Sequence, residues 1–114
     1  MPFRPIEFYD IASSLFKEGG EDEARARTIV SRAYYGAFLV AREEAKIRSA
    51  TGSVHELTAN HYINSGRSAV GNRLNALRVK RNDADYDCGK TVSRKAAGEA
   101  LGLARKIIGV LGAA

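Results

Sequence analysis

Residues 67–87, RSAVGNRLNALRVKRNDADYD, decide the fold because they combine a helical period with a charge on the apolar side. One row of side chains recurs every three or four residues, as on one face of an α-helix. The row comprises Val70, Leu74, Leu77, Arg81 and Ala84. An unpaired buried charge is unfavourable, so Arg81 must carry its guanidinium past the edge of the core or bind an anion or a carboxylate. The plain alternative is an ion pair with Asp85, worth about 0.3–0.5 kcal/mol on an exposed helix.

The whole chain has the size and composition of one globular domain. Its 114 residues are 45% hydrophobic and 27% charged, which suits one core and is too little chain for two. We therefore expect a single domain over residues 1–114. Proline occurs only at positions 2 and 5, so long helices are free to form after them. Cys88 is the only cysteine, which excludes an intrachain disulfide and favours a reducing compartment.

The distribution of charge and apolar residues bears on location and partners. We expect a cytoplasmic protein that does not enter membranes, since no apolar run would span a bilayer and the N-terminus has no hydrophobic signal core. The net charge of +5 is compatible with a polyanionic partner, although many small proteins are basic without one. Basic residues gather in two segments, with Arg67, Arg73, Arg78, Lys80 and Arg81 in the first and Arg94, Lys95, Arg105 and Lys106 in the second.

Apolar periodicity predicts an all-α fold, a four-helix up-and-down bundle with an additional short helix. The expected long helices cover residues 4–18, 21–48, 67–85 and 93–111, and the short one covers 54–63. Glycines 19 and 20 end the first helix, and Ser93 caps the last. The expected inward-facing side chains are Phe8, Ile11, Ala12 and Leu15; Ile29, Ala33, Ala37, Ala41 and Ala45 beside Val30, Tyr34 and Phe38; and Ala97, Leu101, Ala104, Ile108 and Leu111.

A second row of the last helix is unusually rich in glycine. It comprises Gly98, Gly102, Arg105, Gly109 and Gly112. Each interior glycine costs about 0.5–1 kcal/mol relative to alanine, so close approach of another helix would be an offsetting gain. That helix belongs either to this chain or to a second copy, and we expect a homodimer. The alternative is that the last two glycines mark a frayed end.

The connector between the second and third long helices carries both histidines. His55 and His61 are six residues apart, which does not place them on one helical face, and no third ligand accompanies them. The sequence therefore predicts no metal site, and no motif for a cofactor is present.

The order of these features resembles the HEPN domains, named for higher eukaryotes and prokaryotes nucleotide-binding. The resemblance rests on SRAYYGAF at 31–38, the connector that begins near His55, RNDADYD at 81–87 and the final amphipathic helix. It extends from about Ile6 to Leu111 and is nearest to small free-standing prokaryotic members with an ADYD signature. It implies a helical bundle that dimerises, in many members through the helices carrying the signature.

The resemblance also implies a function. Many HEPN proteins are metal-independent ribonucleases, and many prokaryotic ones are toxins of toxin–antitoxin or phage-defence pairs, often beside a nucleotidyltransferase. Their motif is an arginine, a polar residue and, a few positions on, a histidine. Arg81 and Asn82 match the first two, whereas Tyr86 stands in the histidine position. A phenol is a poor base at neutral pH, so the motif favours anion binding over fast cleavage.

Three functional interpretations follow. The first is an RNA-binding and RNA-cleaving cleft between two subunits, with Arg81, Asn82 and Tyr86 as catalytic residues and Arg78 and Lys80 as further RNA- or anion-binding residues. His55 or His61 would replace the missing imidazole, and Asp85 would support the site. Alternatively, in this first interpretation, Tyr86 would be the site that a partner nucleotidyltransferase modifies. The second is an inert module that binds a nucleotide or a partner protein, such as a cognate nucleotidyltransferase or antitoxin, and in which Tyr86 closes the cleft. The third is a purely structural network of Arg81, Asp85 and Tyr86.

Overall fold

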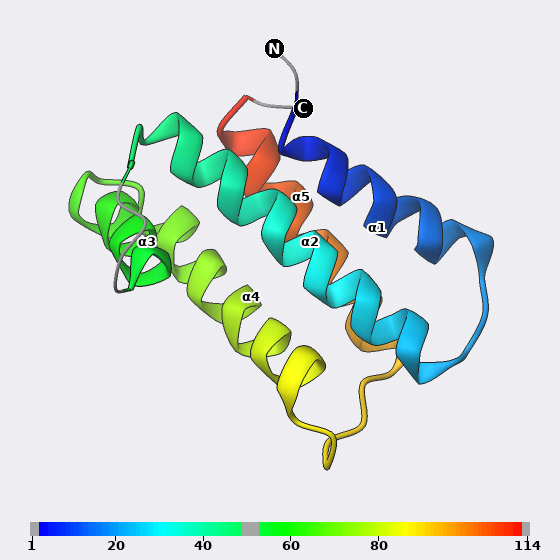
Figure 1. The fold of residues 1–114 in the computed structure, drawn as a ribbon. Coiled ribbons are helices and arrows are strands. Elements are labelled where there is room, and N and C mark those ends of the chain that lie inside the picture. The colour runs from blue at the N-terminus through cyan, green and yellow to red at the C-terminus, as the bar shows by residue number, and fades with distance from the viewer. Residues whose placement is uncertain (1–2, 49–52, 113–114) are drawn as a thin grey trace.

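The computed structural model describes residues 3–48 and 53–112, which form five α-helices and contain no strand. The helices are α1 (Ile6–Glu18), α2 (Glu23–Glu44), α3 (Val54–Asn64), α4 (Ser68–Tyr86) and α5 (Arg94–Val110) (Figure 1). The expected all-α class is therefore confirmed, and α3 is the short helix predicted over 54–63. Part of the connector, residues 49–52, lies outside the described residues.

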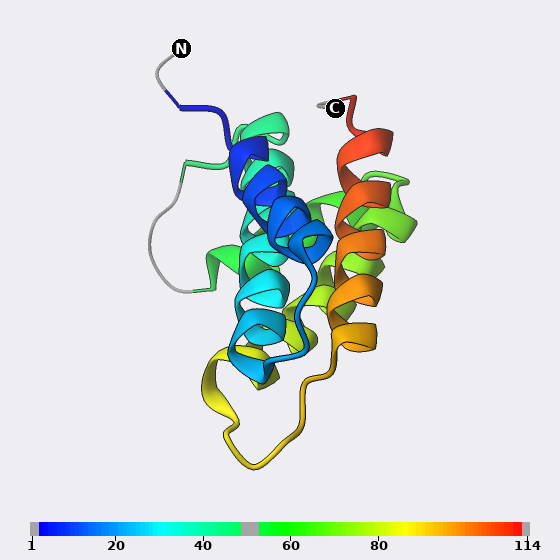
Figure 2. The same cartoon turned by 90° about the vertical axis from the view of Figure 1, so that its right-hand side faces the viewer.

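The long helices are arranged up and down around α2. Successive members α1, α2, α4 and α5 alternate in direction, and α2 contacts all four other helices (Figure 1). Figure 2 shows α1 and α5 side by side, with α1 beginning and α5 ending at the same end of the bundle. The short α3 contacts α4 and, less extensively, α2. Each described helix is too short or too polar to span a membrane.

Local signals set the end of α1 and the start of α5. Gly19 and Gly20 have φ angles of 83° and 99°, which favour glycine and stop α1. The Ser93 hydroxyl accepts a hydrogen bond from the Ala96 N–H at 3.1 Å and caps α5. The prediction that the second helix runs to about residue 48 is wrong. It ends at Glu44, because the chain turns through Lys46 with a φ of 57°.

Apolar rows predicted from the sequence form the core. Every member of the row from Val70 to Ala84 is buried, including Arg81, and so is every member of the apolar row of α5. In α2 both rows are buried apart from the terminal Ala45, which is half-buried. Ile11 is a correction, because 53% of it is exposed. The buried side of α1 is centred on Ala12, which is fully enclosed, and Ile11 lies about a quarter turn away.

Two glycines allow close helix packing, and neither belongs to the row predicted in α5. A Cβ at Gly36 would lie 2.7 Å from the Tyr9 backbone nitrogen, and one at Gly71 would lie 2.5 Å from the Ala59 carbonyl oxygen. By contrast, a Cβ at Gly102 or Gly109 would meet nothing within 4 Å. Close packing within this chain therefore does not account for those two glycines, and the homodimer stays a prediction.

Candidate functional site

Three tyrosine rings, contributed by two helices, lie close to the guanidinium of Arg81. Its guanidinium carbon is 5.2 Å from the ring centre of Tyr34, 5.3 Å from that of Tyr35 and 5.8 Å from that of Tyr86. These distances are within the range of cation–π attraction. Tyr34 and Tyr35 come from α2, whereas Tyr86 is the last residue of α4. Arg81 and the three tyrosines form what we call the arginine–tyrosine cluster. Only 6% of Arg81 is exposed, so its guanidinium does not extend past the edge of the core, which was the first of the two arrangements expected from the sequence.

The charge of Arg81 is only partly balanced. Its Nη1 lies 3.7 Å from Asp85 Oδ2 and donates a long hydrogen bond of 3.4 Å to the Tyr86 hydroxyl. Asp85 is shared, since it also accepts a hydrogen bond from the Ser31 hydroxyl at 3.3 Å. The buried Arg81 Nε has no hydrogen-bond partner among the described residues. A buried donor without a partner is unfavourable by about 1–3 kcal/mol or more, so this edge of the guanidinium is a candidate position for an acceptor.

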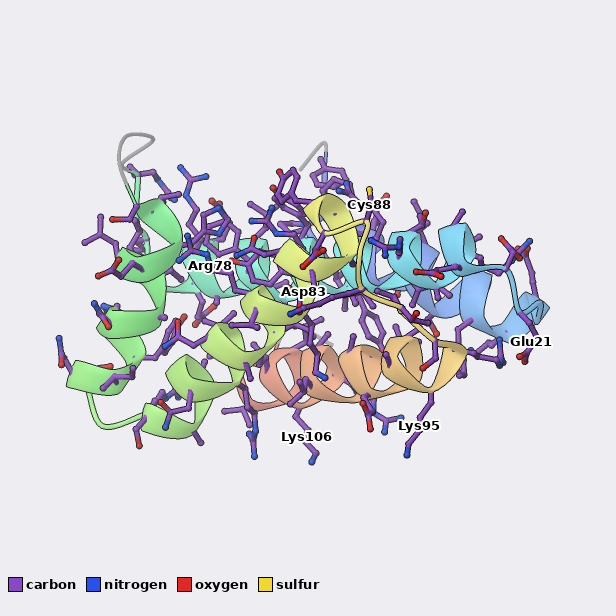
Figure 3. The ribbon with its side chains drawn as sticks, turned by 90° about the horizontal axis from the view of Figure 1, so that it is seen from below. Glu21, Arg78, Asp83, Cys88, Lys95 and Lys106 are labelled. Atoms are coloured by element: carbon purple, nitrogen blue, oxygen red, sulfur yellow. The ribbon has the colours of Figure 1, made fainter. Side chains whose placement is uncertain are left out.

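Arg78 adds a second cation one turn before Arg81. It is half-buried, and its Nε is also buried without a partner among residues 3–48 and 53–112. Figure 3 shows Arg78 on the side of the molecule that carries Cys88, whereas Lys95 and Lys106 project from α5 on the opposite side. Lys80 does not join Arg78 and Arg81, because its ammonium lies 3.7 Å from Glu99 of α5. The basic residues predicted for one surface are thus divided between two.

His55 is the histidine that lies near the cluster. Its Nδ1 is hydrogen-bonded to the Tyr34 hydroxyl, and its ring stacks on Phe38 with centres 4.3 Å apart. Burial, followed by the charges of Arg78, Arg81 and Arg42, lowers the pKa of His55 to about 4. Burial also raises the pKa of Tyr34. At neutral pH the Tyr34 hydroxyl and the His55 imidazole are therefore both uncharged, and the hydrogen bond between them engages Nδ1 as donor or acceptor according to the tautomer.

The remaining predicted site residues lie around the cluster or away from it. Tyr86 is 73% exposed, and Asn82, one turn earlier on α4, is exposed as well. His61 is exposed and packs edge-on against Tyr62, whose hydroxyl donates to the Ala41 carbonyl at 2.6 Å. About a third of a turn separates His61 from His55 around α3. The structure therefore brings His55 to the cluster and leaves His61 outside it.

The depressed pKa of His55 predicts a pH dependence of stability. The unfolded chain takes up this proton near pH 6.5 and the folded chain only near pH 4. Between these values the unfolded state binds more protons, so this contribution to stability is full above pH 6.5 and falls as the pH is lowered towards 4. We expect His55→Gln to flatten the dependence of the urea midpoint on pH in this window. His61→Gln, which removes the exposed imidazole, should retain it. Identical pH profiles for His55→Gln and the parent would contradict the assignment.

Sequence reasoning missed a residue that positions the end of α4. Arg27 of α2 donates hydrogen bonds to the Asp83 and Ala84 carbonyls at 3.1 and 3.0 Å and to two carbonyls of the following loop, those of Asp87 and Lys90. These groups include carbonyls that the last turn of a helix leaves without a partner. Arg27 Nε also donates to Glu23 at 3.0 Å. The Val92 N–H and then the Arg27 guanidinium lower the pKa of Glu23. The only sequence signal was the spacing of Glu23 and Arg27, which indicates a local pair.

Comparison with known proteins adds no identification: no protein-family model, curated protein or solved structure matches this chain. The fold and the site therefore describe the class of protein: an all-α bundle in which a buried, partly neutralised arginine contacts three tyrosine rings.

Proposed function

We propose that this chain is a HEPN domain of a prokaryotic toxin–antitoxin or phage-defence system, and that it binds RNA as a homodimer through the Arg81 site. The observation that carries the proposal is that the buried Nε donors of Arg78 and Arg81 have no partner among the described residues, and that Arg81 contacts the exposed Tyr86. Phosphate oxygens are the acceptors that arginine binds most readily in nucleic acids. The proposal also rests on the resemblance of residues 31–38 and 81–87 to HEPN signatures.

Binding requires a route to Arg81, and Tyr86 is the group that would open it. Tyr86 closes α4, is mostly exposed, and is attached to Arg81 by one hydrogen bond at the long end of the usual range. Rotation of this side chain removes little packing. Asp85 would then keep the guanidinium oriented while a phosphate takes the Nε edge.

The same geometry supports RNA binding as the proposed primary activity and favours slow cleavage. Metal-independent cleavage needs a base for the 2′-hydroxyl and a cation for the phosphate. Arg81 supplies the cation. The Nδ1 of His55 is engaged by Tyr34, so this nitrogen becomes available as a base only when that hydrogen bond breaks.

The test is binding and cleavage of total RNA and of a short labelled RNA, with a chelator present. We expect Arg78→Gln to weaken binding about fourfold at ~0.15 M salt, since each neutralised phosphate of a single strand contributes a slope of about −0.7 in log K against log salt. Arg81→Gln should weaken it further, by about tenfold or more, because two charge-assisted hydrogen bonds are lost. Lys106→Gln, which removes the same charge from the opposite side, is the matched control.

If Arg78→Gln and Lys106→Gln lost equal RNA affinity, the interaction would depend on net charge alone. That result would contradict the proposed site. Circular dichroism and urea midpoints accompany each variant, because Arg81 is buried. Chelator-resistant cleavage that Arg81→Gln abolishes would place a nuclease here, and intact RNA would leave a binding module.

The alternative function is an inert module in which the Arg81 site is structural. One observation favours it: Arg81 is nearly enclosed and contacts Asp85 and Tyr86 of its own helix. In that case the partner would be a protein or a nucleotide. RNA binding would be absent, and Arg81→Gln would lower the melting temperature without any change in RNA retention.

A further inference from the structure

A groove between α1 and α5 has no part in the site described above. The two helices lie side by side (Figure 2), and the groove shares no lining residue with the arginine–tyrosine cluster. Two glycines leave its α5 side open, because a Cβ at Gly102 would meet nothing within 4 Å and one at Gly98 would meet only the Phe16 ring. The cavity has a volume of about 240 Å³, below the roughly 300–1,000 Å³ of pockets for drug-sized ligands. Its size therefore suits a small metabolite.

The polar side chains that line the groove have no partner among residues 3–48 and 53–112. The hydroxyls of Tyr9 and Ser13 make no hydrogen bond within these residues, and Lys17 and Arg105 make no ion pair. No carboxylate is present among the lining residues that the structure describes. The groove therefore presents two unpaired cations and two hydroxyls beside the apolar ring of Phe16, which suits a ligand with both anionic and apolar parts.

The two cations lie toward opposite ends of the groove. Because α1 begins where α5 ends, the two helices run antiparallel (Figure 2). Phe16 lies against Gly98, where a Cβ would be 3.3 Å from its ring, and Lys17 follows Phe16 in the chain. Arg105 comes seven residues after Gly98, which is about 10 Å along the helix at a rise of 1.5 Å per residue. The pair of cations therefore favours a ligand with an anionic group at each end over a single inorganic anion.

We propose that this groove binds a small organic dicarboxylate. One carboxylate pairs with Lys17 and the other with Arg105, and the apolar body between them lies over Gly98 and Gly102. Burial of this body removes apolar surface from water, while both charges stay at the exposed rim, where desolvation costs little. A carboxylate carries one charge, which one cation balances, whereas a phosphate group carries about 1.5–2 charges at pH 7. The inference does not depend on RNA binding, because none of these residues belongs to the proposed RNA site.

The experiment titrates the isotope-labelled full chain, followed by NMR, with succinate, adipate, suberate, octanoate and inorganic phosphate. The backbone N–H groups of Gly98 and Gly102 report on the groove, and that of Gly109, which does not line it, is the internal reference. We expect saturable shifts at the first two only, with affinity rising from succinate to suberate. Suberate should bind about fivefold more tightly than octanoate, which has the same length and a single charge, because it gains a second surface ion pair. Phosphate, which has charge but no apolar body, should give no saturable shift.

Gly102→Leu tests the position of the ligand. The new side chain would occupy the groove, and the open space around its Cβ leaves the helix free to form. We expect suberate to bind about tenfold more weakly or not at all, as followed at the Gly98 N–H. Gly109→Leu is the matched control, because a Cβ there also meets nothing within 4 Å but lies outside the groove. If both variants lose suberate affinity, or if neither does, the groove is not the binding site.

Lys17→Gln and Arg105→Gln test the two charges. Each should lower suberate affinity about fivefold, to the level of octanoate, whereas Lys106→Gln, a change outside the groove, should leave it unchanged. Equal affinities for suberate and octanoate, or saturable binding of phosphate at the same glycines, overturn the proposal. An absence of shifts at Gly98 and Gly102 overturns it as well. Shifts that depend on protein concentration alone would place a second copy of the chain in the groove, and the ligand site would be overturned in favour of self-association.

Discussion

Gly71→Ala is expected to destabilise the protein by about 3 kcal/mol, although alanine is the better helix former. A Cβ at this position would lie 2.5 Å from the Ala59 carbonyl oxygen and 2.5 Å from Ile63 Cγ1. The first neighbour is backbone of α3, which cannot yield without moving the helix. Overpacking of this kind typically costs 1–3 kcal/mol, and more where backbone must shift. For a chain of this length the melting temperature should fall by roughly 10 °C.

Gly102→Ala is the matched control, because it makes the same change in a helix where a Cβ would meet nothing within 4 Å. It should stabilise the isolated chain by about 0.5–1 kcal/mol through helix propensity alone. A parent-like or higher melting temperature for Gly71→Ala would show that α3 does not approach α4 this closely. A loss for Gly102→Ala, with a weaker dimer in sedimentation, would place a second copy of the chain against α5.

Arg27→Ala is expected to have a comparable effect, about 3 kcal/mol, measured as a lower urea midpoint. Its side chain is 19% exposed and donates to four backbone carbonyls at the end of α4 and in the loop that follows. Hydrogen bonds from charged groups contribute about 1.5–3 kcal/mol each, and their removal leaves part-buried carbonyls without a partner. Arg27→Lys should recover only part of the loss, because one ammonium cannot span carbonyls on both sides of the turn.

Arg25→Ala serves as the comparison for Arg27→Ala. Arg25 is also an arginine near the start of α2, but it pairs with exposed carboxylates of Glu18 and Asp22. Surface pairs of this type contribute about 0–1 kcal/mol. If Arg25→Ala and Arg27→Ala lowered the urea midpoint equally, the long-range hydrogen bonds of Arg27 would contribute no more to stability than a surface ion pair.

The sequence predicted what depends on period and local chemistry. The rows of α4 and α5 were found because a helix repeats every 3.6 residues, and the ends of α1 and the start of α5 because glycine and serine act within one turn. The apolar row placed Arg81 beside buried side chains but left open whether its guanidinium leaves the core, and the structure keeps it inside. The predicted end of α2 was wrong, because the chain reverses at Lys46 and no glycine in the sequence indicates this turn.

Contacts between helices were beyond the same reasoning. A glycine inside a helix is unfavourable, so Gly71 was a sequence signal for close helix packing. The prediction of close packing was made instead for α5, where Gly102 and Gly109 face open space. Tyr34 and His55 are 21 residues apart, and Arg27 and Asp87 are 60 residues apart. Whether such pairs meet depends on how helices rotate against one another, which no spacing within one helix determines.

The helix α3 lies at the edge of the bundle, where it packs on α4 and less extensively on α2. This helix touches only α4 and, more lightly, α2, so the other four remain packed together when it detaches. Sub-global opening of a peripheral unit requires less free energy than unfolding of the whole domain. His55 moves with this unit, and its departure frees the imidazole from the Tyr34 hydroxyl. Opening of α3 therefore exposes this proton acceptor to solvent and at the same time separates it from Arg81, so only the closed arrangement holds the two groups together.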